Sequence, residues 1–164
     1  MRICSRLTVT GLLVGALLGM SAGRSERWAV AQPSFVTLAA GFAPNPTELV
    51  GTGGGDRPAA EVVNTANSPT GQCLGYISTA PHEEVVLETH FSNLEMRVES
   101  ALDTTLVISG PGGVWCNDDN GSQNPAIVGA WLPGKYRVWV GAYRAEQIPD
   151  YILYVQESVL GHSR

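Results

Sequence analysis

An acidic turn in the second half of the chain holds the residues best suited to bind a metal ion. Asn117, Asp118, Asp119 and Asn120 follow one another, and each side chain carries oxygen. Ca²⁺ prefers such hard ligands and takes about six to eight of them. We therefore predict a calcium site at this turn, with Asp103 as a further ligand if its strand neighbours the one before the turn. The alternative is a solvated turn in which Asn and Asp bond to the local backbone.

A basic and an aromatic residue alternate with the apolar residues of one predicted strand. Arg137 and Trp139 fall on the face opposite Tyr136, Val138 and Val140, because successive side chains of a strand point to opposite faces. An exposed tryptophan beside a guanidinium group suits a sugar or a peptide. We predict a ligand-binding face at Arg137 and Trp139, with structural packing of the tryptophan as the alternative.

Residues for acid–base or covalent catalysis form no recognisable constellation. The three histidines are His82, His90 and His162. A serine hydrolase needs a serine, a histidine and an aspartate beside an oxyanion hole, yet residues 32–164 contain neither a Gly-x-Ser-x-Gly nor a GDSG segment. Two carboxylate pairs are adjacent in sequence, namely Asp118 with Asp119 and Glu83 with Glu84. Such neighbours rarely flank one substrate bond as a glycosidase requires, so we predict that the protein is not an enzyme.

The N-terminal residues have the layout of a secretory signal. Arg2 and Arg6 precede an apolar run of about twelve residues, and small residues end at Ala31, as in a cleaved signal peptide. We predict cleavage after Ala31, and Gly23 is an alternative site. Because roughly twenty apolar residues are needed to span a bilayer, we predict a secreted or periplasmic protein without a membrane span.

Two cysteines remain if the leader, which holds Cys4, is removed. In an oxidising compartment Cys73 and Cys116 are then the only residues that can form an intramolecular disulfide. Such a bond closes a loop of about forty residues and contributes roughly 3 to 4 kcal/mol in the chain-entropy model. A metal or redox pair is the alternative, but no Cys-x-x-Cys spacing typical of structural zinc is present.

Composition divides the chain into four parts. We predict a signal peptide at 1–31, a Pro/Gly-rich arm at 32–71, a β-sandwich domain at 72–158 and a C-terminal tail at 159–164. Without the leader the chain has six basic and fourteen acidic side chains. Nucleic-acid binding needs clustered Lys and Arg, so this balance predicts no nucleic-acid partner and favours cations.

Beyond the arm, short β-rich runs alternate with turn residues, and no window shows helical spacing. Residues 85–91 and 94–98 read as two antiparallel strands joined at Ser92-Asn93, and the last strand spans 151–156. We predict an all-β, jelly-roll-like antiparallel sandwich of about seven to nine strands with one disulfide. The core candidates are Leu87, Phe91, Leu94, Met96, Val98, Leu106, Ile108, Ile127, Tyr136, Val138, Val140, Leu153 and Val155.

Three motifs in this region occur together in a known family of secreted domains. They are Asp103-Thr104-Thr105-Leu106, Gly110-Pro111-Gly112-Gly113 and Leu132-Pro133-Gly134-Lys135-Tyr136-Arg137-Val138-Trp139-Val140-Gly141. In this order, residues 73–156 resemble the bacterial pre-peptidase C-terminal domain. In that family an aspartate-led strand runs into a Pro/Gly turn, and a later Pro-Gly or Ala-Gly turn opens a Tyr-x-Val-x-Val strand.

The resemblance implies a secreted β-sandwich with a binding or accessory role and no peptidase activity of its own. Some such domains bind calcium, although Thr105 stands where the family commonly has a second acidic residue. Together with Cys73-Leu74-Gly75-Tyr76, the turn Cys116-Asn117-Asp118-Asp119 is similar to an exported, free-standing subgroup. We predict a non-enzymatic module that binds an extracellular protein, peptide or polysaccharide or is displayed at the surface. The alternative is an accessory or prodomain-like partner of a secreted protease or other hydrolase.

Overall fold

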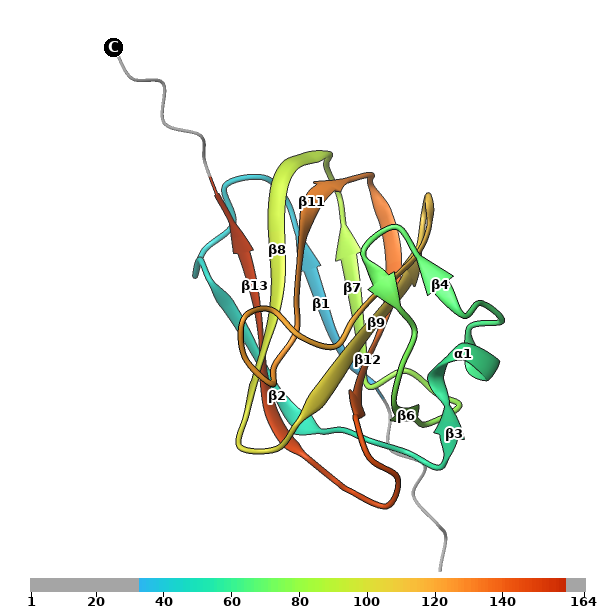
Figure 1. Cartoon of the computed structure of the whole chain (residues 1–164). Coiled ribbons are helices and arrows are strands. Elements are labelled where there is room, and N and C mark those ends of the chain that lie inside the picture. The colour runs from blue at the N-terminus through green and yellow to red at the C-terminus, as the bar shows by residue number, and fades with distance from the viewer. Residues whose placement is uncertain (1–32, 159–164) are drawn as a thin grey trace, which may run out of the picture. The chain divides into compact units, whose positions relative to one another are not determined.

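The computed structural model describes residues 33–158 and shows a domain built almost entirely of β-strands (Figure 1). The predicted leader, the predicted tail and His162 lie outside the described residues. The described part contains thirteen strands and one helix, α1 (Ala59–Val62). Nine of the strands are five residues or longer, and the other four have two residues each. The predicted all-β class is confirmed, and the nine longer strands agree with the expected seven to nine.

Two sheets face each other across the core. The first has seven strands: β1 (Ser34–Leu38), β7 (Glu83–Leu87), β12 (Gly134–Ala142), β9 (Thr104–Gly110) and β10 (Gly113–Asn117) in that order, with β6 (Tyr76–Ile77) and β3 (Arg57–Pro58) continuing beside β12. The second has the order β11 (Ala126–Trp131), β8 (Phe91–Ser100), β13 (Asp150–Glu157) and β2 (Thr47–Thr52). A separate hairpin consists of β4 (Asn67–Ser68) and β5 (Gly71–Gln72). These pairings are antiparallel except that of β1 with β7, which is parallel.

The core lies between the two sheets and contains every residue that the alternation pattern placed there. All thirteen predicted core side chains are buried in one cluster, which also includes Val85, Trp131 and Tyr151. Trp131 Nε1 donates a hydrogen bond to the Leu94 carbonyl at 3.0 Å. The hydroxyl of Tyr136 donates to the carbonyl of Leu132 at 2.8 Å. These large aromatic rings are therefore buried with their polar atoms satisfied.

The expected hairpin at Ser92-Asn93 is wrong. The chain leaves β7 at Leu87 and enters β8 at Phe91, and these strands belong to different sheets. Phe91 pairs with Trp131 and Leu94 pairs with Gly129, so β8 has one more residue than β11 between the same two pairs. Ser92 and Asn93 therefore form a β-bulge and not a turn. The extra residue allows Phe91 and Leu94, three positions apart, both to point into the core.

The predicted arm contributes strands to both sheets. Strand β1 lies at the edge of the first sheet, and β2 lies at the edge of the second. Leu38 is buried, and Val36 and Leu49 pack against the core. These alternating apolar residues explain why two edge strands form in a segment so rich in proline and glycine.

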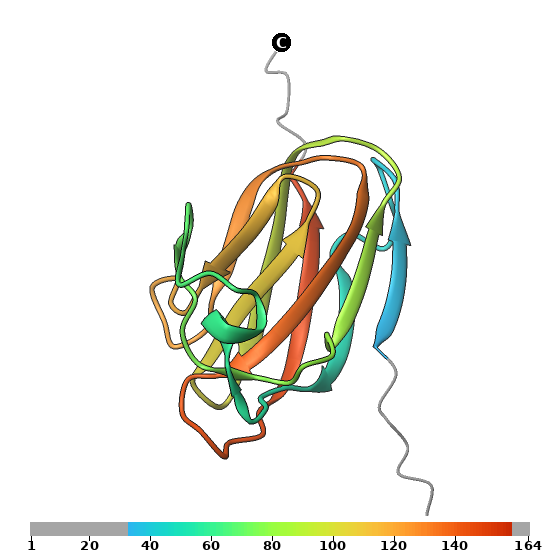
Figure 2. The same cartoon turned by 90° about the vertical axis from the view of Figure 1, so that its right-hand side faces the viewer.

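Between β2 and β6 the chain forms an excursion over the outer face of the first sheet. We call residues 57–75 the cover segment; Figure 2 shows its helix α1 in front of the sheet strands. Beneath it lies a second apolar cluster that includes Ala59, Ile77, Val107 and Trp139. The cover segment thus gives the first sheet a buried outer face, which a two-layer sandwich alone would leave in water.

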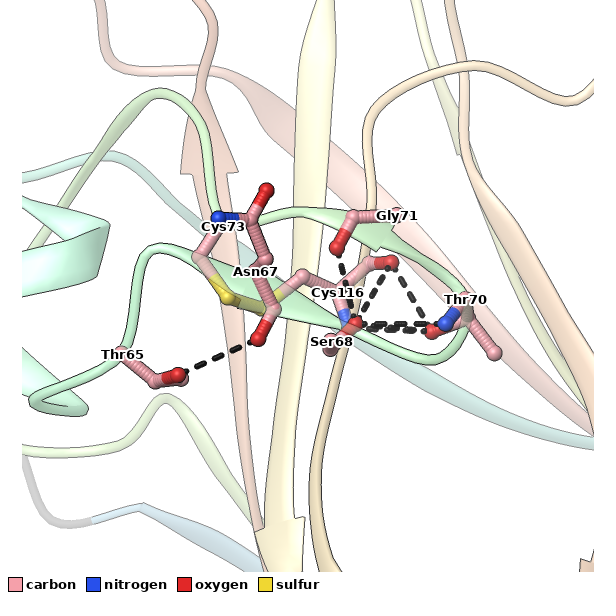
Figure 3. The surroundings of a disulfide bond; sticks show 7 residues. All are labelled: Thr65, Asn67, Ser68, Thr70, Gly71, Cys73 and Cys116. Carbon is pink, nitrogen blue, oxygen red and sulfur yellow. Dashed lines mark hydrogen bonds between the residues drawn. A yellow bond between two sulfur atoms is a disulfide. The ribbon is translucent and has the colours of Figure 1, made fainter.

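The predicted disulfide between Cys73 and Cys116 is confirmed, with a Cα–Cα distance of 5.0 Å (Figure 3). It joins the cover segment to β10. Beside it, the backbone N–H of Cys116 donates to the hydroxyl of Ser68 at 2.9 Å, and the hydroxyl of Thr70 donates to the Cys116 carbonyl at 2.9 Å. Because β10 is an edge strand, these contacts satisfy backbone groups that no strand pairs. Within the described residues, no helix is both long and apolar enough to cross a membrane.

Candidate functional site

A cavity of about 470 Å³ lies between the cover segment and the first sheet. Arg57, Glu61 and Asn64 line it from the cover segment, and Ser109, Arg137 and Trp139 line it from β9 and β12. The cavity therefore contains both residues of the predicted ligand-binding face. The cover residues are contributions that the sequence pattern did not reveal.

Trp139 does not form an open aromatic platform. Its side chain points to the outer face of the first sheet, as the alternation predicts, but it is only 2% exposed. The cover segment and the disulfide bury the ring, together with Ile77 and Val107. The indole Nε1 is also buried and has no hydrogen-bond partner among the described residues. Structural packing, the alternative in the sequence analysis, thus accounts for the burial of Trp139.

Arg137 remains exposed, and its guanidinium group lies over the buried ring. Its Cζ atom is 5.6 Å from the centroid of the Trp139 ring, a cation–π distance. Arg137 Nη2 lies 3.5 Å from the hydroxyl of Ser109, and the guanidinium group forms no ion pair with any described residue. The neighbouring Arg57 pairs with Glu61 at 3.1 Å. Arg137 therefore brings an uncompensated positive charge to the cavity.

The acidic turn lies beside Asp103, as the sequence analysis required. Strand β10 pairs with β9, and this pairing brings Asp118 and Asp119 close enough to act on the carboxyl of Asp103. Burial raises the pKa of Asp103; the charges of Asp119 and Asp118 raise it further, whereas Arg144 lowers it.

Other polar groups of the turn already have protein partners. Asn117 Oδ1 accepts the backbone N–H of Ala126 at 3.1 Å, and Asn120 donates its N–H to the Asn124 carbonyl at 3.2 Å. Within residues 33–158, no three His, Cys, Asp or Glu side chains lie in an arrangement that could hold a metal ion. Calcium binding at this turn stays a prediction.

A buried polar cluster at one end of the sandwich escaped the sequence analysis. Glu83 is 1% exposed, and its Oε1 accepts the hydroxyl of Tyr151 at 2.6 Å. Burial raises the pKa of Glu83, and the hydroxyls of Tyr151 and Ser34 partly offset that rise. Burial and the bond to Glu83 raise the pKa of Tyr151 well above its usual range. The sequence did contain a signal for this cluster. Glu83 lies two residues before Val85 and therefore shares the inward face of β7 with it.

His82 borders this cluster without forming a catalytic triad. Its Nδ1 accepts the backbone N–H of Val140 at 3.1 Å, so the ring proton lies on Nε2, 3.3 Å from the hydroxyl of Ser78. A general base would need Nε2 unprotonated. Burial lowers the pKa of His82, which is consistent with a neutral ring. His90 is exposed on the connection after β7.

The adjacent carboxylates Glu83 and Glu84 do not share one face of the sheet. Glu83 and Glu84 alternate along β7, so their side chains point to opposite faces of the first sheet. Glu84 instead pairs with Lys135 at 3.0 Å. Glu83 and Glu84 therefore do not lie on the two sides of one substrate bond, as a glycosidase pair must.

Comparison with known proteins gives two similarities. No family model matches the sequence. A stretch of 79 residues, 46% of this chain, is 34% identical to an uncharacterized protein of Synechococcus elongatus and covers 59% of that protein. The chain thus matches about three fifths of the length of this relative. Among solved structures, Aeromonas hydrophila PliG, a periplasmic lysozyme inhibitor of g-type lysozyme, aligns over 77% of this chain and all of its own, at 12% identity and a TM-score of 0.39.

Proposed function

We propose that the protein is an exported, non-enzymatic module that binds a carboxylate group of an extracellular protein in the cavity at Arg137. The observation that carries this proposal is the convergence of two guanidinium groups on one cavity, one of them without an ion-pair partner among the described residues. Guanidinium groups bind carboxylates through paired, charge-assisted hydrogen bonds.

The polar side chains around Arg137 support an anionic ligand with further hydrogen-bonding groups. Asn64, Thr79 and Ser109 line the same cavity and offer amide and hydroxyl donors. The chain is acidic overall, with fifteen acidic and ten basic residues. Attraction of an anion must therefore be local to this cavity, since the whole molecule repels it.

A peptide partner fits the cavity better than a sugar. Sugar-binding sites use open aromatic rings as stacking surfaces, and the indole of Trp139 is covered. The exposed guanidinium groups alone suffice to bind a carboxylate, whether it belongs to an aspartate or glutamate side chain or to a C-terminus. An acidic surface on a secreted hydrolase would satisfy the same site, so the accessory role is a special case of this proposal.

Replacing Arg137 with glutamine tests the proposal. Fluorescence polarisation with a labelled hexaglutamate peptide should show about tenfold to hundredfold weaker binding by Arg137→Gln, because a charge-assisted hydrogen bond contributes roughly 1.5 to 3 kcal/mol. Added salt should weaken binding by the parent protein.

Arg97→Gln is the matched control, because Arg97 lies on the second sheet beside Glu99 and Tyr154. This variant should bind as the parent protein does. Equal affinity of Arg137→Gln and the parent protein would contradict the proposal, and so would an absence of binding by the parent protein at millimolar peptide.

A further inference from the structure

The second sheet leaves its outer face open to solvent, whereas the first sheet is covered. In the second sheet β13 lies between β8 and β2 (Figure 1), and every outward-facing side chain of these strands and of β11 is exposed or half-buried. The outward positions carry four carboxylates and one guanidinium group, which belong to Glu48, Glu95, Glu99, Asp150 and Arg97. This excess of negative charge favours a positively charged partner.

A groove of about 460 Å³ opens on this face where β8 ends and β13 begins. Its apolar lining includes Val50 and Ile152, which lie opposite each other in the pairing of β2 with β13. Val50 is 71% exposed, so it presents apolar surface that the described chain leaves uncovered. On the other side of Ile152 its partner in β8 is Glu99. The groove thus combines an apolar floor with a carboxylate.

A second carboxylate, that of Asp150, lines the same groove. Asp150 lies two residues before Ile152 on the same face of β13, so it is a diagonal neighbour of Glu99. Such neighbours are roughly 7 to 8 Å apart, close enough for one cationic group to lie between their side chains. Asp150 forms no ion pair with any described residue, and Glu99 approaches Arg97 only to 3.7 Å.

The other polar side chains that line the groove already have partners. The hydroxyl of Ser100 donates to the Asp150 carbonyl at 2.7 Å and accepts the N–H of Leu102 at 3.2 Å. The hydroxyl of Tyr151 donates to Glu83 inside the sandwich. The side-chain groups left for a ligand are therefore carboxylates, which accept hydrogen bonds and do not donate them. A ligand must bring the donors and the positive charge.

We propose that this groove binds a lysine side chain on the surface of a partner protein. The aliphatic stem of the lysine lies along Val50 and Ile152, and its ammonium group donates to Glu99 and Asp150. An ammonium group suits two carboxylates on different strands, because its three N–H donors point in different directions, whereas the planar guanidinium fork matches a single carboxylate.

The face extends beyond the groove in a way that favours a protein over a free polyamine. Glu48 and Glu95 lie on the same face outside the groove lining, and only a larger partner can reach them together with the groove. The charges are felt across the face: partial burial raises the pKa of Tyr154, and Glu99 and Glu48 raise it further, whereas Arg97 lowers it. The inference does not depend on the function proposed for the Arg137 cavity, which lies on the first sheet.

Fluorescence polarisation with a labelled hexalysine peptide tests the two carboxylates. The double variant Glu99→Gln, Asp150→Asn should bind about threefold to twentyfold more weakly than the parent protein, because each exposed ion pair changes the affinity by up to about fivefold. The matched control is Asp56→Asn, Glu88→Gln, which loses the same two charges beside β3 and β7 of the first sheet. It should retain the parent affinity at physiological salt, where distant charges are screened.

The apolar floor is tested separately by Val50→Thr, which keeps the shape and the charge of the site. It should weaken hexalysine binding about twofold to fourfold, since burial of one methyl group changes an affinity by roughly that factor. In NMR spectra hexalysine should shift the methyl signals of Val50 and Ile152. The methyl signals of Leu132, which is exposed between β11 and β12, should not move.

Equal hexalysine affinity of the parent protein and the Glu99→Gln, Asp150→Asn variant would overturn the proposal, and so would no binding by the parent protein at millimolar peptide. Equal losses in that variant and its control would show unspecific attraction to an acidic protein and would overturn it too. Spermidine that binds as tightly as hexalysine would refute the protein partner, and self-association that the double variant abolishes would assign the groove to a second copy instead. Hexaglutamate affinity should be the same in all these variants, which separates this test from that of the Arg137 cavity.

Discussion

At the scale of single residues, a backbone hydrogen bond decides what His82 can do. The N–H of Val140 occupies Nδ1 at 3.1 Å, so protonation of that nitrogen breaks the bond. A serine beside a histidine suggests a nucleophile with its general base. In this tautomer, however, His82 serves as a hydrogen-bond acceptor for the backbone. Identity and spacing of residues would not have distinguished the two roles.

The lowered pKa of His82 predicts a loss of stability in acid. Below about pH 6.5, the usual pKa of histidine, His82 binds a proton in the unfolded chain but stays neutral in the folded chain. The free energy of unfolding should therefore fall as pH decreases from about 6.5 toward the folded-state pKa.

His82→Asn retains an acceptor for the Val140 N–H but cannot titrate. Urea unfolding measured between pH 7 and 5 should show a flatter pH dependence for His82→Asn than for the parent protein. Glu83, with its raised pKa, acts in the opposite direction, since its contribution falls as pH rises. The exposed His90→Asn serves as the control, and equal slopes in all three proteins would refute the assignment.

At the scale of elements, the cover segment turns a two-layer sandwich into one with a protected outer face. Its position depends on Cys73 and on the hydroxyls of Ser68 and Thr70, which bond to the backbone of Cys116. The Arg137 cavity exists only because α1 lies over β9 and β12. Packing of the cover segment and formation of the candidate site are thus linked.

Removing the disulfide should weaken this link. Because the cysteines are 43 positions apart in the sequence, the chain-entropy model predicts that the double variant Cys73→Ser, Cys116→Ser loses about 3 to 4 kcal/mol of unfolding free energy. Denaturant unfolding measures this loss. Affinity for the hexaglutamate peptide should fall as well, because the cover segment carries Arg57. An unchanged midpoint would show that packing alone holds the cover segment.

At the scale of the whole molecule, the chain carries excess negative charge, so a bound cation should stabilise the folded protein. The negative charges of Asp118 and Asp119 repel that of Asp103 and raise its pKa. A calcium ion at the predicted site would relieve this repulsion. Calcium at ten times its dissociation constant should raise the free energy of unfolding by about 1.4 kcal/mol, a melting-temperature shift of a few degrees. Thermal unfolding in EDTA and in millimolar calcium measures it.

Asp119→Asn supplies the control for the calcium prediction. It should abolish the response to calcium and, because it removes repulsion from Asp103, should not destabilise the protein in EDTA. A melting temperature that is the same in EDTA and in millimolar calcium would refute the calcium site.

The sequence by itself determined the all-β class, the disulfide and the core. Alternation of apolar residues is a local property of each strand, so Leu106, Val138 and Leu153 could be placed inside before their partners were known. Cys73 had only one partner in the predicted mature chain. These features follow from residue type and spacing alone.

Only the tertiary structure decided which strands share a sheet and which side chains share a site. The alternation around Phe91 could not distinguish a bulge from a turn, because both break the same pattern. Burial of Trp139 depends on a cover segment that begins some eighty residues earlier. Glu83 and Tyr151 meet across the two sheets, 68 residues apart. Such long-range contacts depend on how the two sheets and the cover segment pack, and local sequence patterns do not encode that packing.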